Sequence, residues 1–228
     1  MKRKFISLLL ILVLALGIFT ACAGETTPGK TEGDGGPDAE QYFNYALVAD
    51  PTSFDSAKAT DSTAIYMLID LMEPLLRLEV QKDGGLDMAY AGAEEFQVSE
   101  DGLVWTFKLR ENYWSDGQRV TADDYVYGVQ RVLDPDTAAP YSYILMPILN
   151  AYSVNMGEMP VEELGIKAVD DDTLEISLEY ETSYFDMLLY HTTMMPVRKD
   201  IVEKYGEQYG TEVDRAVYCG PFVPEEWV

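Results

Sequence analysis

The amino-acid sequence predicts a mixed α/β fold, and three segments carry the prediction. FQVSEDGLVWTFKLR alternates apolar and polar residues around the turn sequence SEDG, as a β-hairpin does. TADDYVYGVQRVL places apolar residues at helical spacing behind a threonine that can cap a helix. IKAVDDDTLEISLEY repeats the hairpin pattern around an acidic turn. With 228 residues, the chain has the length for a substantial core and for one or two domains.

The chain begins with the pattern of a secretory signal peptide. Three basic residues at 2–4 precede an apolar stretch, 5–16, that is short for a membrane span. The stretch leads into IFTAC, which resembles a bacterial lipobox and predicts a signal peptide of residues 1–21 with lipid on Cys22. Phe19 stands where such motifs more often have leucine. A secreted protein cut elsewhere and an uncleaved anchor are therefore the alternatives.

The segment that follows has the composition of a flexible tether. It is rich in glycine, proline, threonine and acidic residues and lacks an apolar period. Residues 22–40 are therefore predicted to be a lipidated cysteine and a linker. A lipid at Cys22 would attach the protein to the membrane surface without spanning it.

Charge and cysteine content exclude several classes of partner. The formal net charge of −24 argues against nucleic acid, whose phosphates would be repelled. The acidic residues either favour cationic ligands or solubilise the surface. Lipidation of Cys22 would leave Cys219 without a disulfide partner in the chain. These two cysteines and the one histidine, His191, are too few to form a convincing zinc site. No metal or cofactor is expected.

The first third of the predicted domain holds a strand, a helix and a turn. Residues 41–50 alternate as a short strand does. Asp61 or Ser62 can cap the helix that follows, and Pro74 ends it. KDGG at 82–85 is a turn signal. The buried face of the helix is predicted to hold Ile65, Leu68, Ile69 and Met72.

The remaining elements follow from the three opening segments. In the first hairpin, the core face is predicted to hold Trp105, Phe107 and Leu109. Thr121 and Asp124 form a variant of the capping box at the start of the central helix. The second hairpin turns at 170–172, and two short helices are predicted near 183–190 and 199–205. Its buried residues are expected to be Leu174, Ile176 and Leu178.

No constellation of residues predicts a reaction. The acidic run 170–172 could hold calcium, but it lacks the spaced ligands and glycine of an EF-hand, and a solvated turn explains it better. His191 could pair with Ser183 or Ser115, yet no nucleophile-elbow glycines surround either serine. The sequence therefore favours binding over catalysis.

The central part of the sequence resembles a known protein family. EDGLVWTFKLRENYWSDGQRVTADDYVYGVQRVLDPDTAAPYSY closely resembles the signature region of the bacterial extracellular solute-binding proteins of family 5, the dipeptide, oligopeptide and nickel receptors of ABC importers. The resemblance continues through LGIKAVDDDTLEISLEYETSYFDMLLYHTTMMPVRKDIVEKYG and ends in YCGPFVPEEW. Together with LVADPTSFDSAKATD it covers about residues 43–228. DPDTAAPY and the LGIKAVDD hairpin are most similar to the oligopeptide receptors.

This resemblance implies a periplasmic-binding-protein-like α/β fold with an extra, inserted small domain. Residues 41–59 and 198–228 would be pieces of the first lobe, and residues 60–197 the inserted second α/β domain. The third part of the family fold, a lobe that closes over the ligand, has no counterpart in this sequence. The chain is therefore expected to be an N-terminal fragment.

The resemblance also implies where a ligand would bind. Six residues match family positions at or near the ligand: Ala49, Asp50, Pro51, Thr52, Tyr141 and His191. The first four lie in the segment whose backbone pairs with an extended peptide. The tyrosine matches one that faces the peptide, and the histidine matches one near the cleft. For these two rings the alternative is a packed side chain with a satisfied polar tip.

The function implied is that of a lipid-anchored receptor at the extracytoplasmic face of the plasma membrane. It would capture oligopeptides, deliver them to the permease subunits of an ABC importer and catalyse no reaction. One alternative is a receptor of the same family for nickel, a sugar or another small ligand. The other is a truncated surface or signalling lipoprotein that does not transport.

Overall fold

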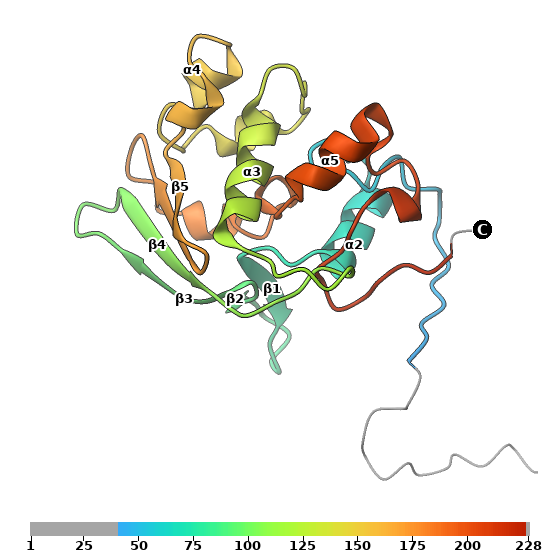
Figure 1. The fold of residues 1–228 in the computed structure, drawn as a ribbon. Helices are drawn as coiled ribbons and strands as arrows, with labels where there is room; N and C mark the ends of the chain where they lie inside the picture. The colour runs from blue at the N-terminus through green and yellow to red at the C-terminus, as the bar shows by residue number, and fades with distance from the viewer. Residues whose placement is uncertain (1–40, 227–228) are drawn as a thin grey trace, which may run out of the picture. The chain divides into compact units, whose positions relative to one another are not determined.

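The computed structural model describes residues 41–226 (Figure 1). Its contacts divide the chain into two units, Met1–Tyr45 and Ala46–Val228, and all of the helices and strands described below lie in the second. The predicted signal peptide, Cys22 and the predicted tether lie outside the described residues. Among the described residues, no helix is long and apolar enough to cross a membrane.

The centre of the fold is a four-stranded antiparallel sheet made of the two predicted hairpins. Its strands are β3 (Ala93–Val98), β4 (Val104–Leu109), β5 (Ile166–Asp170) and β6 (Thr173–Ser177), in the order β3-β4-β6-β5. The two hairpins join where β4 pairs with β6, which places Phe107 opposite Leu174. Both side chains are fully buried. The alternation predicted for β4 is confirmed, because Trp105, Phe107 and Leu109 are its buried residues.

Helix α3 (Ala122–Leu133) packs against the β5–β6 hairpin (Figure 1). The predicted cap is present, since the Thr121 amide donates to the Asp124 carboxylate at 2.9 Å. The helix turns its predicted apolar residues inward, and Val129 is fully buried. It ends at Leu133, with Asp134 as its C-cap and a proline next, as the sequence predicts. Helix α3 thus closes one face of the core.

Helix α2 (Ser62–Leu71) is capped by Asp61, as predicted, and its predicted buried face is confirmed only in part, because Leu68 and Met72 are buried. Ile69 is 37% exposed, whereas Leu71 is buried. The residues that face the core are Ala64, Leu68 and Leu71, at spacings of four and three. Ile65 is half-buried, whereas its neighbour Ala64 is fully buried.

Two further differences concern strands. The alternating residues 41–50 form no strand, and the side chains of Tyr42 and Tyr45 are 69% and 61% exposed. Alternation produces a strand only where a neighbouring strand can pair with the backbone, and no described strand pairs with this segment. The predicted turn 82–85 joins a hairpin that was not predicted, β1 (Leu76–Val80) and β2 (Leu86–Tyr90).

The second half of the unit consists mostly of short helical turns. Helix α5 (Lys199–Tyr205) is confirmed, whereas the helix predicted near 183–190 is a single 3-10 turn. Helix α4 (Ala151–Asn155) was not predicted. The 3-10 turns are η1 (Ser142–Leu145), η2 (Val161–Glu163), η3 (Phe185–Leu188), η4 (Thr192–Met194), η5 (Gly206–Gln208) and η6 (Val213–Arg215).

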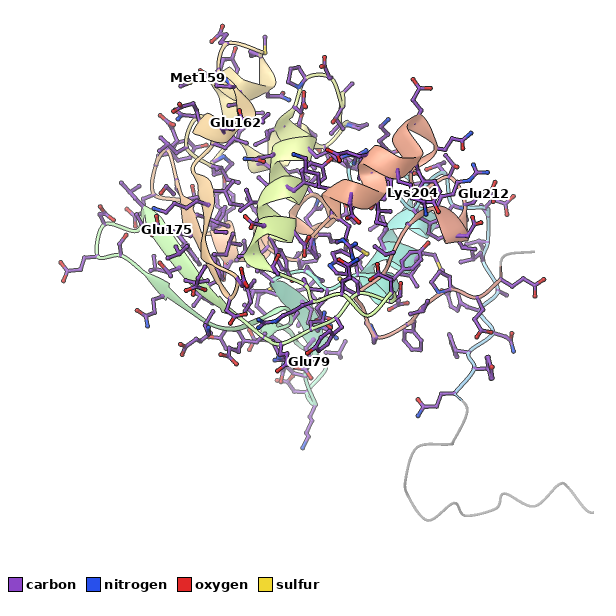
Figure 2. All side chains as sticks on the ribbon, in the orientation of Figure 1. Glu79, Met159, Glu162, Glu175, Lys204 and Glu212 are labelled. Atoms are coloured by element: carbon purple, nitrogen blue, oxygen red, sulfur yellow. The ribbon has the colours of Figure 1, made fainter. Side chains whose placement is uncertain are left out.

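Some of the acidic residues lie far from one another on the surface. Figure 2 shows Glu79 of β1, Glu162 of η2 and Glu212, just before η6, well apart. In the turn 170–172, Asp172 forms ion pairs with Arg119 and Lys108. Within residues 41–226, no group of three metal-binding side chains comes together. The ion pairs of Asp172 fit the charged hairpin turn that the sequence favours.

Candidate functional site

The segment Ala49–Thr52, here the edge, is a short stretch of backbone that begins in a bend at 48–49 and is exposed at Ala49, Asp50 and Thr52. Ala49 and Asp50 are exposed, and within the described part of the chain their backbone amides have no hydrogen-bond partner. Pro51 is buried and has no amide hydrogen to donate. The Thr52 amide is already used, because it donates to the Asp61 carboxylate at 3.1 Å. The donors open to an incoming chain are therefore those of Ala49 and Asp50.

Asp61 holds this edge against helix α2. One carboxylate oxygen accepts from the Ala64 amide at 2.9 Å and caps the helix, while the other accepts from the amide and hydroxyl of Thr52. Burial alone would raise the pKa of Asp61, but the hydrogen bonds from Thr52 and Ala64 outweigh it and hold that pKa below its ordinary value. The cap and the edge are thus fixed by one ionised side chain.

Tyr141 and His191 form a ring pair beside the same residues. The Tyr141 hydroxyl donates to the Thr60 carbonyl at 3.3 Å, one residue before Asp61. The two rings meet edge to face, with centroids 5.5 Å apart and planes at 87°. Both side chains are half-buried, so each keeps an open surface. Fifty residues separate them in sequence, and the fold brings them into contact.

The ring of His191 is oriented by its own chain. Its Nδ1 accepts from the Thr193 amide at 3.2 Å and lies 3.0 Å from the Thr193 hydroxyl. The proton of the neutral ring is therefore on Nε2, the nitrogen left for another partner. Burial lowers the pKa of His191, which favours this neutral form at pH 7.

A pH dependence of stability follows from this lowered pKa. Below about pH 6.5 the unfolded chain takes up a proton at His191 before the folded chain does, so the free energy of unfolding is expected to fall as pH falls. His191→Asn is the matched variant, because its side-chain oxygen can accept from the Thr193 amide without titrating. Urea denaturation from pH 7.5 to 5 should show a smaller loss of stability for the variant. Identical pH dependence of both proteins would refute this contribution.

The predicted site residues therefore fall into two parts that meet at Thr60 and Asp61. The backbone edge touches Asp61, and the ring pair touches Thr60. Within residues 41–226, His191 forms no hydrogen bond with Ser115 or Ser183, because its Nδ1 bonds Thr193, and Ser115 accepts from the Tyr218 amide at 3.2 Å. The arrangement offers amide donors and aromatic faces, which are binding groups.

One buried ion pair was not predicted from the sequence. Arg131 of α3 forms a two-pronged ion pair with Asp55, with N···O distances of 2.6 and 2.7 Å. The side chains are 10% and 2% exposed. Burial alone would lower the pKa of Arg131, but the bonds to Asp55 outweigh it and raise that pKa. The available signal was an arginine directly before the apolar residues Val132 and Leu133 at the end of a helix.

A separate hollow of about 700 Å³ lies at the other end of α2. Its charged lining residues are the acids Glu73, Glu79 and Glu111 and the arginines Arg77 and Arg110. Arg77 pairs with Glu73. The hollow contains none of the six predicted site residues.

Comparison with known proteins places the chain in a family of binding proteins. Residues 88–228 match the family described as bacterial extracellular solute-binding proteins, family 5, middle part. A dipeptide-binding protein of Lactococcus lactis subsp. cremoris is 32% identical over 97% of this chain and 38% of its own length. A probable deoxycholate-binding periplasmic protein of Escherichia coli is 37% identical over 83% of this chain and 35% of its own length.

The solved structures agree with the sequence matches. The substrate-binding domain of an oligopeptide ABC transporter from Bacillus anthracis superposes with a TM-score of 0.79 and 44% identity, over 84% of this chain and 36% of that one. The chain belongs to the family 5 solute-binding proteins, which are receptors and not enzymes, and it has their periplasmic-binding-protein-like α/β fold. It spans little more than a third of the length of these relatives.

Proposed function

We propose that this chain contributes one side of the peptide-binding surface of an ABC-importer receptor. The observation that carries the proposal is the exposed backbone edge at Ala49 and Asp50, whose amides are open and whose neighbour Thr52 is fixed by Asp61. An extended peptide can add to such an edge as a strand does, through main-chain hydrogen bonds. The dipeptide and oligopeptide names of the relatives support a peptide as the ligand.

The ring pair supplies the second contact of the proposed surface. Tyr141 offers an aromatic face to a peptide side chain, while its hydroxyl is occupied by Thr60. His191 offers Nε2–H as a neutral donor to a peptide carbonyl. Main-chain pairing with loose side-chain contacts gives affinity for many sequences and little selectivity among them.

The proposal also covers the chain's organisation and place in the cell. Residues 41–59 and 198–228 belong to the first lobe, and residues 60–197 form the inserted second domain. Lipid on Cys22 and the tether 23–40 attach the receptor to the extracytoplasmic face of the membrane, next to its permease. Mass spectrometry of the N-terminal peptide from bacterial membranes tests the anchor, and an unmodified residue 22 would refute it.

The ligand class is tested by calorimetric titration of the purified chain with a mixture of tri- to pentapeptides and, separately, with deoxycholate. We expect the peptide titration to give binding heat and the deoxycholate titration to give none. Binding of deoxycholate that peptide cannot displace would instead assign the chain to the ligand class of its Escherichia coli relative.

Tyr141→Ala is expected to weaken peptide binding by about 1–2 kcal/mol, or roughly five- to thirtyfold, because an aromatic contact at the surface is lost. Tyr152→Ala is the control, since Tyr152 is 64% exposed on α4 and is not one of the predicted site residues. Equal affinities of the two variants, measured by the same titration, would remove Tyr141 from the site.

A further inference from the structure

The loop that carries the proposed edge is organised around one buried carboxylate. Asp55 is 1% exposed, and its Oδ1 accepts from the Ala57 amide at 3.0 Å. Its backbone carbonyl accepts from the amides of Lys58 and Ala59 at 3.0 and 2.9 Å. Its own backbone amide donates to the Ser53 hydroxyl oxygen at 3.0 Å. The conformation of residues 53–59 therefore depends on where this one residue sits.

Arg131 ties that carboxylate to two distant segments of the chain. Its guanidinium holds both oxygens of Asp55, and it also lies over the ring of Tyr209 at 5.3 Å from the centroid. Gly210 follows Tyr209 in sequence, and its carbonyl accepts a hydrogen bond from the Phe54 amide at 2.7 Å. The loop, helix α3 and residues 209–210 thus meet at one ion pair.

The same pair links the two halves of the proposed peptide surface. Asp55 follows the edge 49–52 by three residues. Arg131 lies on α3, which contacts both η1 and η4, the turns that begin directly after Tyr141 and His191. Under the proposed division of the chain, Asp55 and Tyr209 belong to the first lobe and Arg131 to the inserted domain. The pair therefore bridges these two parts.

Stability alone does not account for such a pair. Replacing a buried ion pair by apolar side chains of similar size is often neutral or stabilising, because desolvation of two charges offsets their attraction. An apolar pair makes no directional hydrogen bonds. Two parallel hydrogen bonds from a planar guanidinium fix both the distance and the angle of the carboxylate.

We propose that Arg131 is a positioning residue for peptide binding: through Asp55 it holds the edge 49–52 at a fixed place relative to Tyr141 and His191. The inference rests on the proposed function, and it assigns a role to a residue that does not touch the peptide. It requires that loss of the two-pronged geometry loosens the edge even where folding is retained.

Three variants separate positioning from folding. Arg131→Lys keeps the charge and loses the planar fork. The double variant Asp55→Leu with Arg131→Met removes both charges together, so that neither is left buried and alone. Arg77→Lys makes the same chemical change in a surface ion pair, with Glu73, and serves as the control.

The first readout needs no ligand. The Thr52 amide, bonded to Asp61, reports whether the edge is held, and its hydrogen exchange can be followed by NMR. Arg131→Lys and the double variant are expected to exchange faster at Thr52, while amides of β4 and β6 keep wild-type protection. Wild-type exchange at Thr52 in Arg131→Lys would overturn the proposal.

The second readout is peptide affinity. Both Arg131 variants are expected to bind peptide at least about fivefold more weakly than wild type, whereas Arg77→Lys binds normally. Wild-type affinity in Arg131→Lys would overturn the proposal, whether or not the double variant folds. Absence of peptide binding by the wild-type chain would refute the proposed function instead, and the Thr52 exchange would still decide whether Arg131 positions the edge.

Discussion

Phe107→Ala is expected to lower the free energy of unfolding by about 3–5 kcal/mol, because it removes a fully buried ring at the centre of the sheet. Phe107 lies 5.6 Å from Phe96 and 6.3 Å from Trp105, measured between ring centroids. It also stands opposite Leu174 where the two hairpins join. Neither hairpin can move alone to fill the cavity, so relaxation recovers little of the loss.

Urea denaturation measures this effect, with the slope of the transition expected to stay unchanged. Tyr152→Ala is the control, because this exposed tyrosine should contribute within about 0.5 kcal/mol. A loss below about 1 kcal/mol for Phe107→Ala would show that the two hairpins do not share one core.

Gly210→Ala is the second change with a large expected effect, and it acts directly on the proposed site. Gly210 has a φ of +69°, which a side chain disfavours by about 1–2 kcal/mol. An added Cβ would also lie 2.5 Å from the Asp55 nitrogen and 2.9 Å from the Phe54 carbonyl carbon. These are backbone atoms, so the loop 53–59 itself must shift. We expect a total loss of about 2–5 kcal/mol.

The matched control is Gly84→Ala. Gly84 has a similar φ of +84°, but an added Cβ there meets nothing within 4 Å. The control therefore carries the backbone strain without the steric clash. The difference between the two variants in free energy of unfolding, measured by urea denaturation, gives the cost of the steric clash. Peptide titration of Gly210→Ala should show weakened binding. Equal stabilities would mean that the loop does not pack against residue 210 in solution.

Local patterns predicted the elements of the sheet and its covering helix. The hairpins formed by β3–β4 and β5–β6, and the capped helix α3, could be read from alternation, turn residues and the Thr121 cap, because each depends on residues close in sequence. The set of residues that α2 buries could be predicted only in part. The burial of Leu71 and the exposure of Ile69 follow from how the helix packs in the assembled core.

The candidate site divides in the same way. Resemblance to a family indicated Tyr141 and His191, but not that their rings lie in contact, because fifty residues separate them. It also did not indicate that Thr52 is unavailable as a donor, which follows from its bond to Asp61. Asp55 and Arg131 are 76 residues apart, and only the folded chain brings them together. Tertiary contacts of this kind leave no local pattern in a single sequence.

The proposed pairing of an extended peptide with the backbone edge at Ala49 and Asp50 can be tested directly by ¹H–¹⁵N NMR. The purified chain is titrated with a tetrapeptide while the backbone amides of these two residues are followed. Both amides are expected to shift and to become protected from exchange, while the backbone amide of Asn112, in the separate hollow, stays unchanged. Saturable shifts at Asn112, with Ala49 and Asp50 unaffected, would contradict it and place the peptide at the other end of α2.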